Sequence, residues 1–108
     1  MLPLELHLLT SSRKAHQDGS YNTPDFAESS FVTLHLYLNE ADEASKLEGG
    51  ATRFHELYGG KGFLDVVPKV GRVLLFQHQK LVHSGADVYA GVKYTLRTDV
   101  MYRVTANK

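Results

Sequence analysis

The fold class of this chain is indicated first by one stretch, Phe31-Val32-Thr33-Leu34-His35-Leu36-Tyr37-Leu38. It is rich in β-branched and aromatic residues, which favour extended strands. Side chains along a strand point alternately to opposite faces, so Thr33, His35 and Tyr37 share one face. The stretch is therefore predicted to be a central strand of a sheet.

Short apolar stretches bounded by Gly, Pro, Asn and Asp recur on both sides of this strand, and sustained helical periodicity is scarce. Residues 39–47 are acidic and Ala-rich, which fits either one or two helical turns or a loose excursion. Other strands are predicted at residues 4–8, 14–18, 51–58, 64–67, 72–77, 80–84 and 92–104, with a loop over residues 18–30. About eight strands with few helical residues suit a double-sheet jelly roll. The predicted fold is thus an all-β, double-stranded β-helix barrel of the jelly-roll or cupin-like kind.

The composition indicates one ordinary globular domain over residues 1–108, with 43% hydrophobic and 22% charged residues. The formal charge is zero, with 12 basic and 12 acidic side chains, so no patch for nucleic acid or an anionic membrane is predicted. The apolar runs are too short to span a bilayer, and residues 2–10 lack the basic start of a signal peptide. A cytoplasmic or nuclear location is the default expectation. The chain has no cysteine, which excludes disulfides and thiolate metal sites.

The candidate metal ligands are His16, Asp18 and His83. Two imidazoles and one carboxylate can hold Fe(II) on one side and leave the opposite side open for other ligands. A jelly roll brings distant strands side by side, so the His-x-Asp pair and His83 could meet at one mouth of the barrel. The alternative is that His16 lies on the surface and His83 caps a turn.

The last predicted strand carries Lys93, Thr95, Arg97 and Asp99 at alternate positions, which places them on one face. A buried ammonium without a partner is costly, so an inward Lys93 indicates an anionic ligand or an internal carboxylate. Alternatively, Lys93 is a solvated strand residue and Asp99 pairs with Arg97. Arg97 competes with Lys93 for a ligand carboxylate, and the sequence does not separate these roles.

Four segments of the chain follow one another in a recognisable order. They are AHQDGSY at residues 15–21, FVTLHLYLN at 31–39, GGATRF at 49–54, and VHSG at 82–85 with Lys93 ten residues after His83. In this order the segments resemble the prolyl 4-hydroxylase-like branch of the 2-oxoglutarate- and Fe(II)-dependent dioxygenases. The resemblance runs from about Leu4 to Arg103, which is nearly the whole chain.

This resemblance implies a role for each candidate site residue. His16, Asp18 and His83 would hold Fe(II). Lys93 would pair with the distal carboxylate of 2-oxoglutarate, with help from the hydroxyl of Thr95. The Tyr37 hydroxyl would bond a carboxylate of the co-substrate. A carboxylate at position 18 favours hydroxylation, because oxygenases that transfer halide lack it.

Several other residues are assigned by position. Tyr21 follows the His-x-Asp pair on a loop and could face the substrate, and His35 could do so from the central strand. The alternative for His35 is a hydrogen-bonded core imidazole. Two further imidazoles match no family position and are interpreted as exposed or structural; they are His55 and His78. Phe54 and Phe76 are predicted to be core residues.

The predicted activity is hydroxylation of an unactivated C–H bond, coupled to the conversion of 2-oxoglutarate and O2 into succinate and CO2. Ascorbate is included as an optional reductant. The resemblance suggests a prolyl residue of a protein as the first substrate, and other side chains or small molecules stay open. Two alternatives remain: a metal-binding cupin-like module, and a truncated oxygenase that serves as an interaction domain. Relatives usually have helices ahead of the barrel, and this chain has no room for them, so oligomerisation is a second way to cover the exposed sheet.

Overall fold

The computed structural model describes residues 4–56 and 60–103, and these residues form ten β-strands and no α-helix. The strands are β1 (Glu5–Leu9), β2 (Arg13–His16), β3 (Glu28–Tyr37), β4 (Glu48–Gly49), β5 (Thr52–His55), β6 (Phe63–Val66), β7 (Val73–Gln77), β8 (His83–Gly85), β9 (Val88–Ala90) and β10 (Lys93–Arg103). The predicted all-β class is therefore confirmed. No helix among the described residues is long and apolar enough to cross a membrane.

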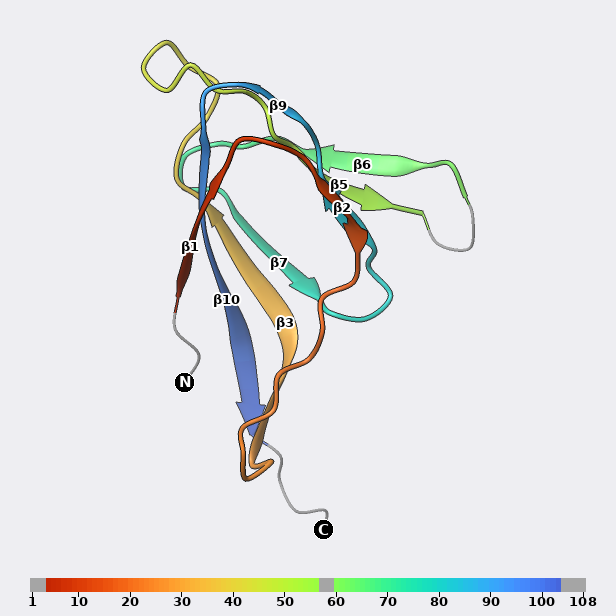
Figure 1. Cartoon of the computed structure of the whole chain (residues 1–108). Helices are drawn as coiled ribbons and strands as arrows, with labels where there is room; N and C mark the ends of the chain where they lie inside the picture. The colour runs from red at the N-terminus through yellow and green to blue at the C-terminus, as the bar shows by residue number, and fades with distance from the viewer. Residues whose placement is uncertain (1–3, 57–59, 104–108) are drawn as a thin grey trace.

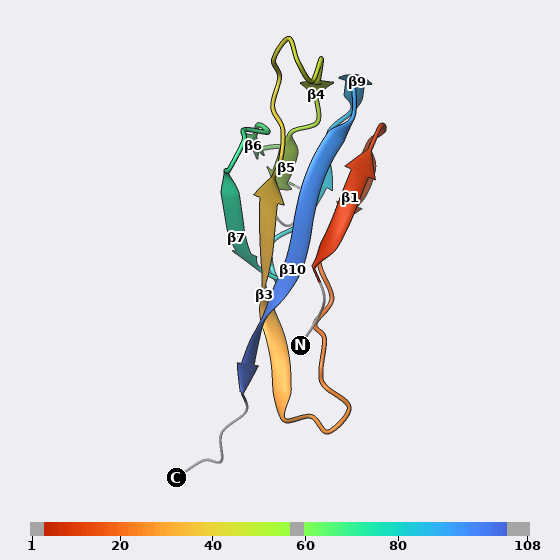
Figure 2. The ribbon, with the colours of Figure 1, turned by 90° about the vertical axis from the view of Figure 1, so that its left-hand side faces the viewer.

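The strands build two antiparallel sheets of four strands each. The first sheet has the order β1-β10-β3-β7 and the second has the order β2-β8-β5-β6, while β4 and β9 form a separate short pair (Figure 1). Figure 2 shows β7, β3, β10 and β1 of the first sheet side by side. This arrangement is consistent with a jelly-roll-like β-sandwich.

The pair β4–β9 was not predicted, because its strands of two and three residues are too short for an alternating pattern. The segment between β3 and β4 is a loop with a single turn, in which the Lys46 amide donates to the Asp42 carbonyl. This loop lies within the alternatives predicted for residues 39–47.

Strand β3 is central, as its sequence predicts. It pairs with β10 on one side and β7 on the other, and its inward positions include the buried Thr33 and Tyr37. On the opposite face, a row of apolar side chains crosses the whole sheet. Leu6 lies opposite Leu96, which lies opposite Leu36 and then Val73. Leu6 is 57% exposed, so this outer face meets solvent in the described chain.

The space between the two sheets is filled by a small set of aromatic rings. Phe76 of β7 packs edge-on against Phe54 of β5, with centroids 5.2 Å apart, and against the His83 ring at 4.8 Å. Tyr37 of β3 is completely buried, and its hydroxyl hydrogen-bonds with that of Thr52 on β5. These contacts join the two sheets and fix β8, where His83 lies.

The close approach of Gly91, in the turn between β9 and β10, to the backbone of Lys46 gives a stability prediction. A Cβ on Gly91, whose φ is 72°, would lie 2.8 Å from the Lys46 carbonyl oxygen, whereas Gly71, with φ of 80°, has open space around it. Both alanine variants carry the cost of a positive φ, and only Gly91→Ala adds a clash with backbone. We expect Gly91→Ala to lower the free energy of unfolding by about 1–2 kcal/mol more than Gly71→Ala. Urea unfolding measures both, and equal losses would contradict the close approach.

Candidate metal centre

Strand pairing brings the three candidate ligands together. His16 ends β2 and His83 begins β8, and the two residues lie directly opposite each other in the antiparallel register. Their ring centroids are 4.4 Å apart, and Asp18 follows two residues after β2 ends. One potential ligand atom from each of the three side chains lies within 4.8 Å of the other two. The structure thus brings the predicted triad into one cluster.

Backbone carbonyls orient both imidazoles. The Nδ1 atom of His16 lies 2.7 Å from the Lys14 carbonyl oxygen, and that of His83 lies 3.3 Å from the Leu81 carbonyl oxygen. Since a carbonyl can only accept, each Nδ1 donates to its carbonyl, and this contact turns each Nε2 toward Asp18. The two Nε2 atoms lie 3.4 Å and 3.5 Å from Oδ1 of Asp18. Both rings therefore direct Nε2 to the point where a metal ion would bind.

The second oxygen of Asp18 is held by the opposite sheet. Thr33 donates its hydroxyl to Oδ2 over 2.6 Å, and Nη2 of Arg97 lies 3.3 Å from the same oxygen. Burial alone would raise the pKa of Asp18, but hydrogen bonds from His83 and Thr33 and the charge of Arg97 lower it well below its usual range. Asp18 is therefore an anion whose Oδ1 faces the imidazoles. Two imidazole nitrogens and one carboxylate oxygen form a donor set that suits Fe(II).

Arg97 takes part in a chain of polar contacts that continues from Asp18. Its Nη2 lies 3.5 Å from Oδ1 of Asp99, and Nε2 of His78 lies 3.6 Å from that same oxygen. The predicted pairing of Arg97 with Asp99 thus exists, and the contact with Asp18 is an additional one. His78 is only 1% exposed, so of the two interpretations of this imidazole the structural one fits.

Lys93 lies at the start of β10 and is 2% exposed. Its amine forms no ion pair with any carboxylate in residues 4–56 and 60–103, and it lies 5.6 Å from the centroid of the Tyr37 ring. Burial, and then the charge of Arg13, lower the pKa of Lys93 to about 8. Gly50 makes room for the Lys93 stem, because a Cβ at that position would lie 3.1 Å from its Cδ.

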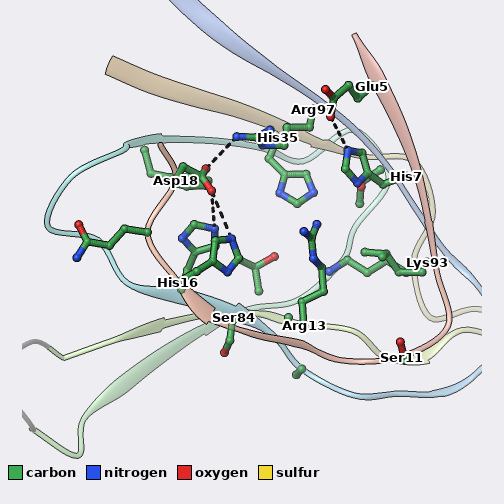
Figure 3. Close-up of a pocket in the computed structure, with 18 of the residues that line it drawn as sticks. Glu5, His7, Ser11, Arg13, His16, Asp18, His35, Ser84, Lys93 and Arg97 are labelled. Atoms are coloured by element: carbon green, nitrogen blue, oxygen red, sulfur yellow. Dashed lines mark hydrogen bonds and ion pairs between the residues drawn. The ribbon is translucent and has the colours of Figure 1, made fainter. Parts of the chain in front are cut away.

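A cavity of about 300 Å³ connects Lys93 with the triad (Figure 3). This volume is at the lower end of the range for small-molecule sites. The predicted site residues that line it are His16, Asp18, His35, His83, Lys93, Thr95 and Arg97. An alternating strand, β10, supplies three of them, as its pattern predicts.

His35 lies toward the middle of this cavity in Figure 3. Its Nε2 is buried and has no hydrogen-bond partner among the described residues. Burial, and then the charge of Lys93, lower the pKa of His35 to about 4, so the ring is neutral at pH 7. A neutral imidazole with a free nitrogen can serve a bound ligand as a hydrogen-bond partner.

The two predicted tyrosines do not line the cavity. Tyr21 lies on the loop after the His-x-Asp pair, and 41% of its surface is exposed. The Tyr37 hydroxyl bonds Thr52, and Thr52 itself is a cavity residue.

Sequence reasoning missed other residues that line the cavity, chiefly Glu5, His7 and Arg13. Alternation over Leu4-Glu5-Leu6-His7-Leu8 puts Glu5 and His7 on one face, which was a usable signal. Arg13 gave no such signal, because residues three apart on a regular strand point to opposite faces. A register shift between Arg13 and His16 brings both to the same cavity.

A protein-family model matches most of this chain. The model described as the 2OG-Fe(II) oxygenase superfamily matches residues 6–98, which is most of the chain and includes every residue of the triad together with Lys93, Thr95 and Arg97. No curated protein matches the chain.

The contact between Thr33 and Asp18 leads to a prediction about metal affinity. Thr33→Val keeps the β-branched shape and removes the hydroxyl that orients the carboxylate. We expect divalent-metal affinity to fall roughly 10- to 100-fold, as is usual when a group that orients a ligand is lost. The control is Thr98→Val, which changes a residue opposite Leu34 on the outer face of the sheet. Titration with Co²⁺, followed by its visible absorption, measures both, and equal affinities would refute the role of Thr33.

Proposed function

The chain belongs to the 2OG-Fe(II) oxygenase superfamily, and from this premise we propose that it is a hydroxylase of the prolyl 4-hydroxylase-like branch. The proposal is supported above all by the convergence of two Nε2 atoms and one carboxylate oxygen at a cavity that also contains a buried lysine. A site of this kind gives a metal ion and an anionic co-substrate adjacent positions.

His16, Asp18 and His83 would hold Fe(II) through Nε2, Oδ1 and Nε2. Bound Fe(II) and 2-oxoglutarate would supply the chemistry, in which O2 oxidises a substrate C–H bond to C–OH while 2-oxoglutarate becomes succinate and CO2. The protein's contribution is to orient these groups. The backbone acceptors of His16 and His83 set the ring positions, and Thr33 and Arg97 set the position of Asp18.

Lys93, rather than Arg97, would bind the distal carboxylate of 2-oxoglutarate. The guanidinium of Arg97 is already engaged by Asp18 and Asp99, whereas the amine of Lys93 has no carboxylate partner in the described chain. Thr95 is buried two residues further along the same face and could donate its hydroxyl to the same ligand. Tyr37 would contribute through its bond to Thr52, which lines the cavity.

The proposed primary substrate is a prolyl residue of a protein, with Tyr21 at the approach to the site and His35 inside it. The support for this choice is the order of the four family segments, including GGATRF at residues 49–54. Ascorbate would maintain iron in the reduced state during turnover. A purely structural metal module, or a non-catalytic oxygenase domain, would bind ligands without releasing succinate.

Succinate release tests the proposed activity. The protein with Fe(II), 2-oxoglutarate and ascorbate should release succinate, and release should require the metal. Asp18→Ala should abolish it, because the anionic ligand is lost. The matched control Asp87→Ala removes an exposed carboxylate that does not line the cavity, and it should keep full activity. If wild-type protein binds both ligands and releases no succinate, the chain is a binding module.

The lowered pKa of Lys93 gives a pH prediction. The charged form of Lys93 attracts a carboxylate, and this form is lost as the pH rises through about 8. Arg13, His35 and Tyr37 are the titratable groups near the amine, and His35 is already neutral in this range. We expect the affinity for 2-oxoglutarate to fall about tenfold between about pH 7 and pH 9, in line with the lost protonated fraction.

Calorimetry with Mn²⁺ in place of Fe(II) measures this profile. Lys93→Arg is the control, because a guanidinium keeps its charge over the whole range. Its profile should be flat. A flat profile for the wild-type protein would contradict the assignment of Lys93.

A further inference from the structure

Arg13 and Lys93 are two cations that approach the same part of the cavity. Figure 3 shows the Arg13 side chain extending into the cavity toward Lys93. Arg13 comes from β2 at the exposed mouth, and Lys93 comes from β10 in the buried interior. Gly85 of β8 lies opposite Arg13, and a Cβ there would be 3.4 Å from the Arg13 Cβ. The absence of a side chain at Gly85 leaves room for the arginine stem.

The acids around the cavity are engaged elsewhere. Glu5 pairs with His7 over 3.1 Å, and Asp18 faces the two imidazoles, Thr33 and Arg97. Neither Arg13 nor Lys93 forms an ion pair within the part of the chain that the structure describes. Two neighbouring like charges raise each other's free energy, and the lowered pKa of Lys93 reflects this in part. An anion bound between them would relieve that cost.

We infer that Arg13 and Lys93 bind the same ligand carboxylate, the one farthest from the metal ligands. The guanidinium offers two parallel N–H donors from the mouth, while the ammonium supplies a point charge from the interior. Arg13 therefore makes the site selective for 2-oxo dicarboxylates over 2-oxo monocarboxylates of the same length. This inference rests on the proposed function.

The comparison of two acids in the Arg13→Gln variant tests this role. The probes are 2-oxoglutarate and 2-oxopentanoate, which has the same five carbons and lacks the distal carboxylate. With Mn²⁺ bound, we expect Arg13→Gln to lower the affinity for 2-oxoglutarate about tenfold, because one charge-assisted contact is lost. Its affinity for 2-oxopentanoate should be unchanged. Lys14→Gln is the control, because it removes one positive charge from the adjacent position of β2, outside the cavity lining.

A second measurement does not need the metal or the co-substrate. In wild-type protein with ¹³C-methylated lysines, the resonance of Lys93 reports its titration. Arg13→Gln should raise the pKa of Lys93, and Lys14→Gln should leave it unchanged. Arg13→Lys should restore part of the 2-oxoglutarate affinity, because the charge returns without the paired donors. If Arg13→Gln loses affinity for 2-oxoglutarate and for 2-oxopentanoate by the same factor, Arg13 only supports the structure, and the inference is overturned.

The outcomes separate the two proposals. If wild-type protein with Mn²⁺ binds neither acid, the proposed function fails and the inference fails with it. If wild-type protein binds 2-oxoglutarate and Arg13→Gln binds it equally well, the inference alone fails.

Discussion

The carboxylate of Asp18 is the contact on which the site depends, because its two oxygens face two different sheets. Oδ1 lies 3.4–3.5 Å from the imidazole nitrogens of the β2–β8 pair. Oδ2 accepts a hydrogen bond from Thr33 on β3 and lies next to Arg97 on β10. A change in the packing of either sheet would therefore move one oxygen relative to the other. The geometry of the candidate metal centre and the packing of the sandwich are parts of one arrangement.

The cations around the cavity divide into two groups with different tasks. Arg97 lies between two carboxylates and forms part of a polar chain that continues to His78. Lys93 and Arg13 have no carboxylate partners in the described residues, and both line the cavity. Charge balance thus distinguishes groups that orient a metal ligand from groups that are available to a bound anion. Sequence spacing alone places Lys93 and Arg97 on one face and does not reveal this difference.

Much of the fold and of the candidate metal triad could be predicted from the sequence, for physical reasons that apply to particular elements. Strands β3 and β10 are long and alternate regularly, so their inward residues could be assigned from periodicity. His16 and Asp18 are close in sequence, and the family segments indicated His83 as their partner. Arg13 could not be found this way, because a register shift in β2 breaks the alternation.

The periodicity of the sequence also could not predict the contacts between the two sheets. The bond between Tyr37 and Thr52 joins residues on different sheets, and the burial of His78 beside Asp99 depends on how β10 packs. Sequence spacing shows which face of a strand a residue occupies, but it does not show which residue of the other sheet packs against it.

The interior between the sheets is thin, and this has a thermodynamic consequence. The buried hydrophobic side chains among the described residues are Tyr37, Leu47 and Phe76, and several of their buried neighbours are polar. A domain with so little apolar interior has a small margin of stability. If His16, Asp18 and His83 hold an ion, that ion would bind the native state in preference to the unfolded chain, and its binding free energy would add to that margin. Removal of that ion by a chelator would then lower the free energy of unfolding of the whole domain.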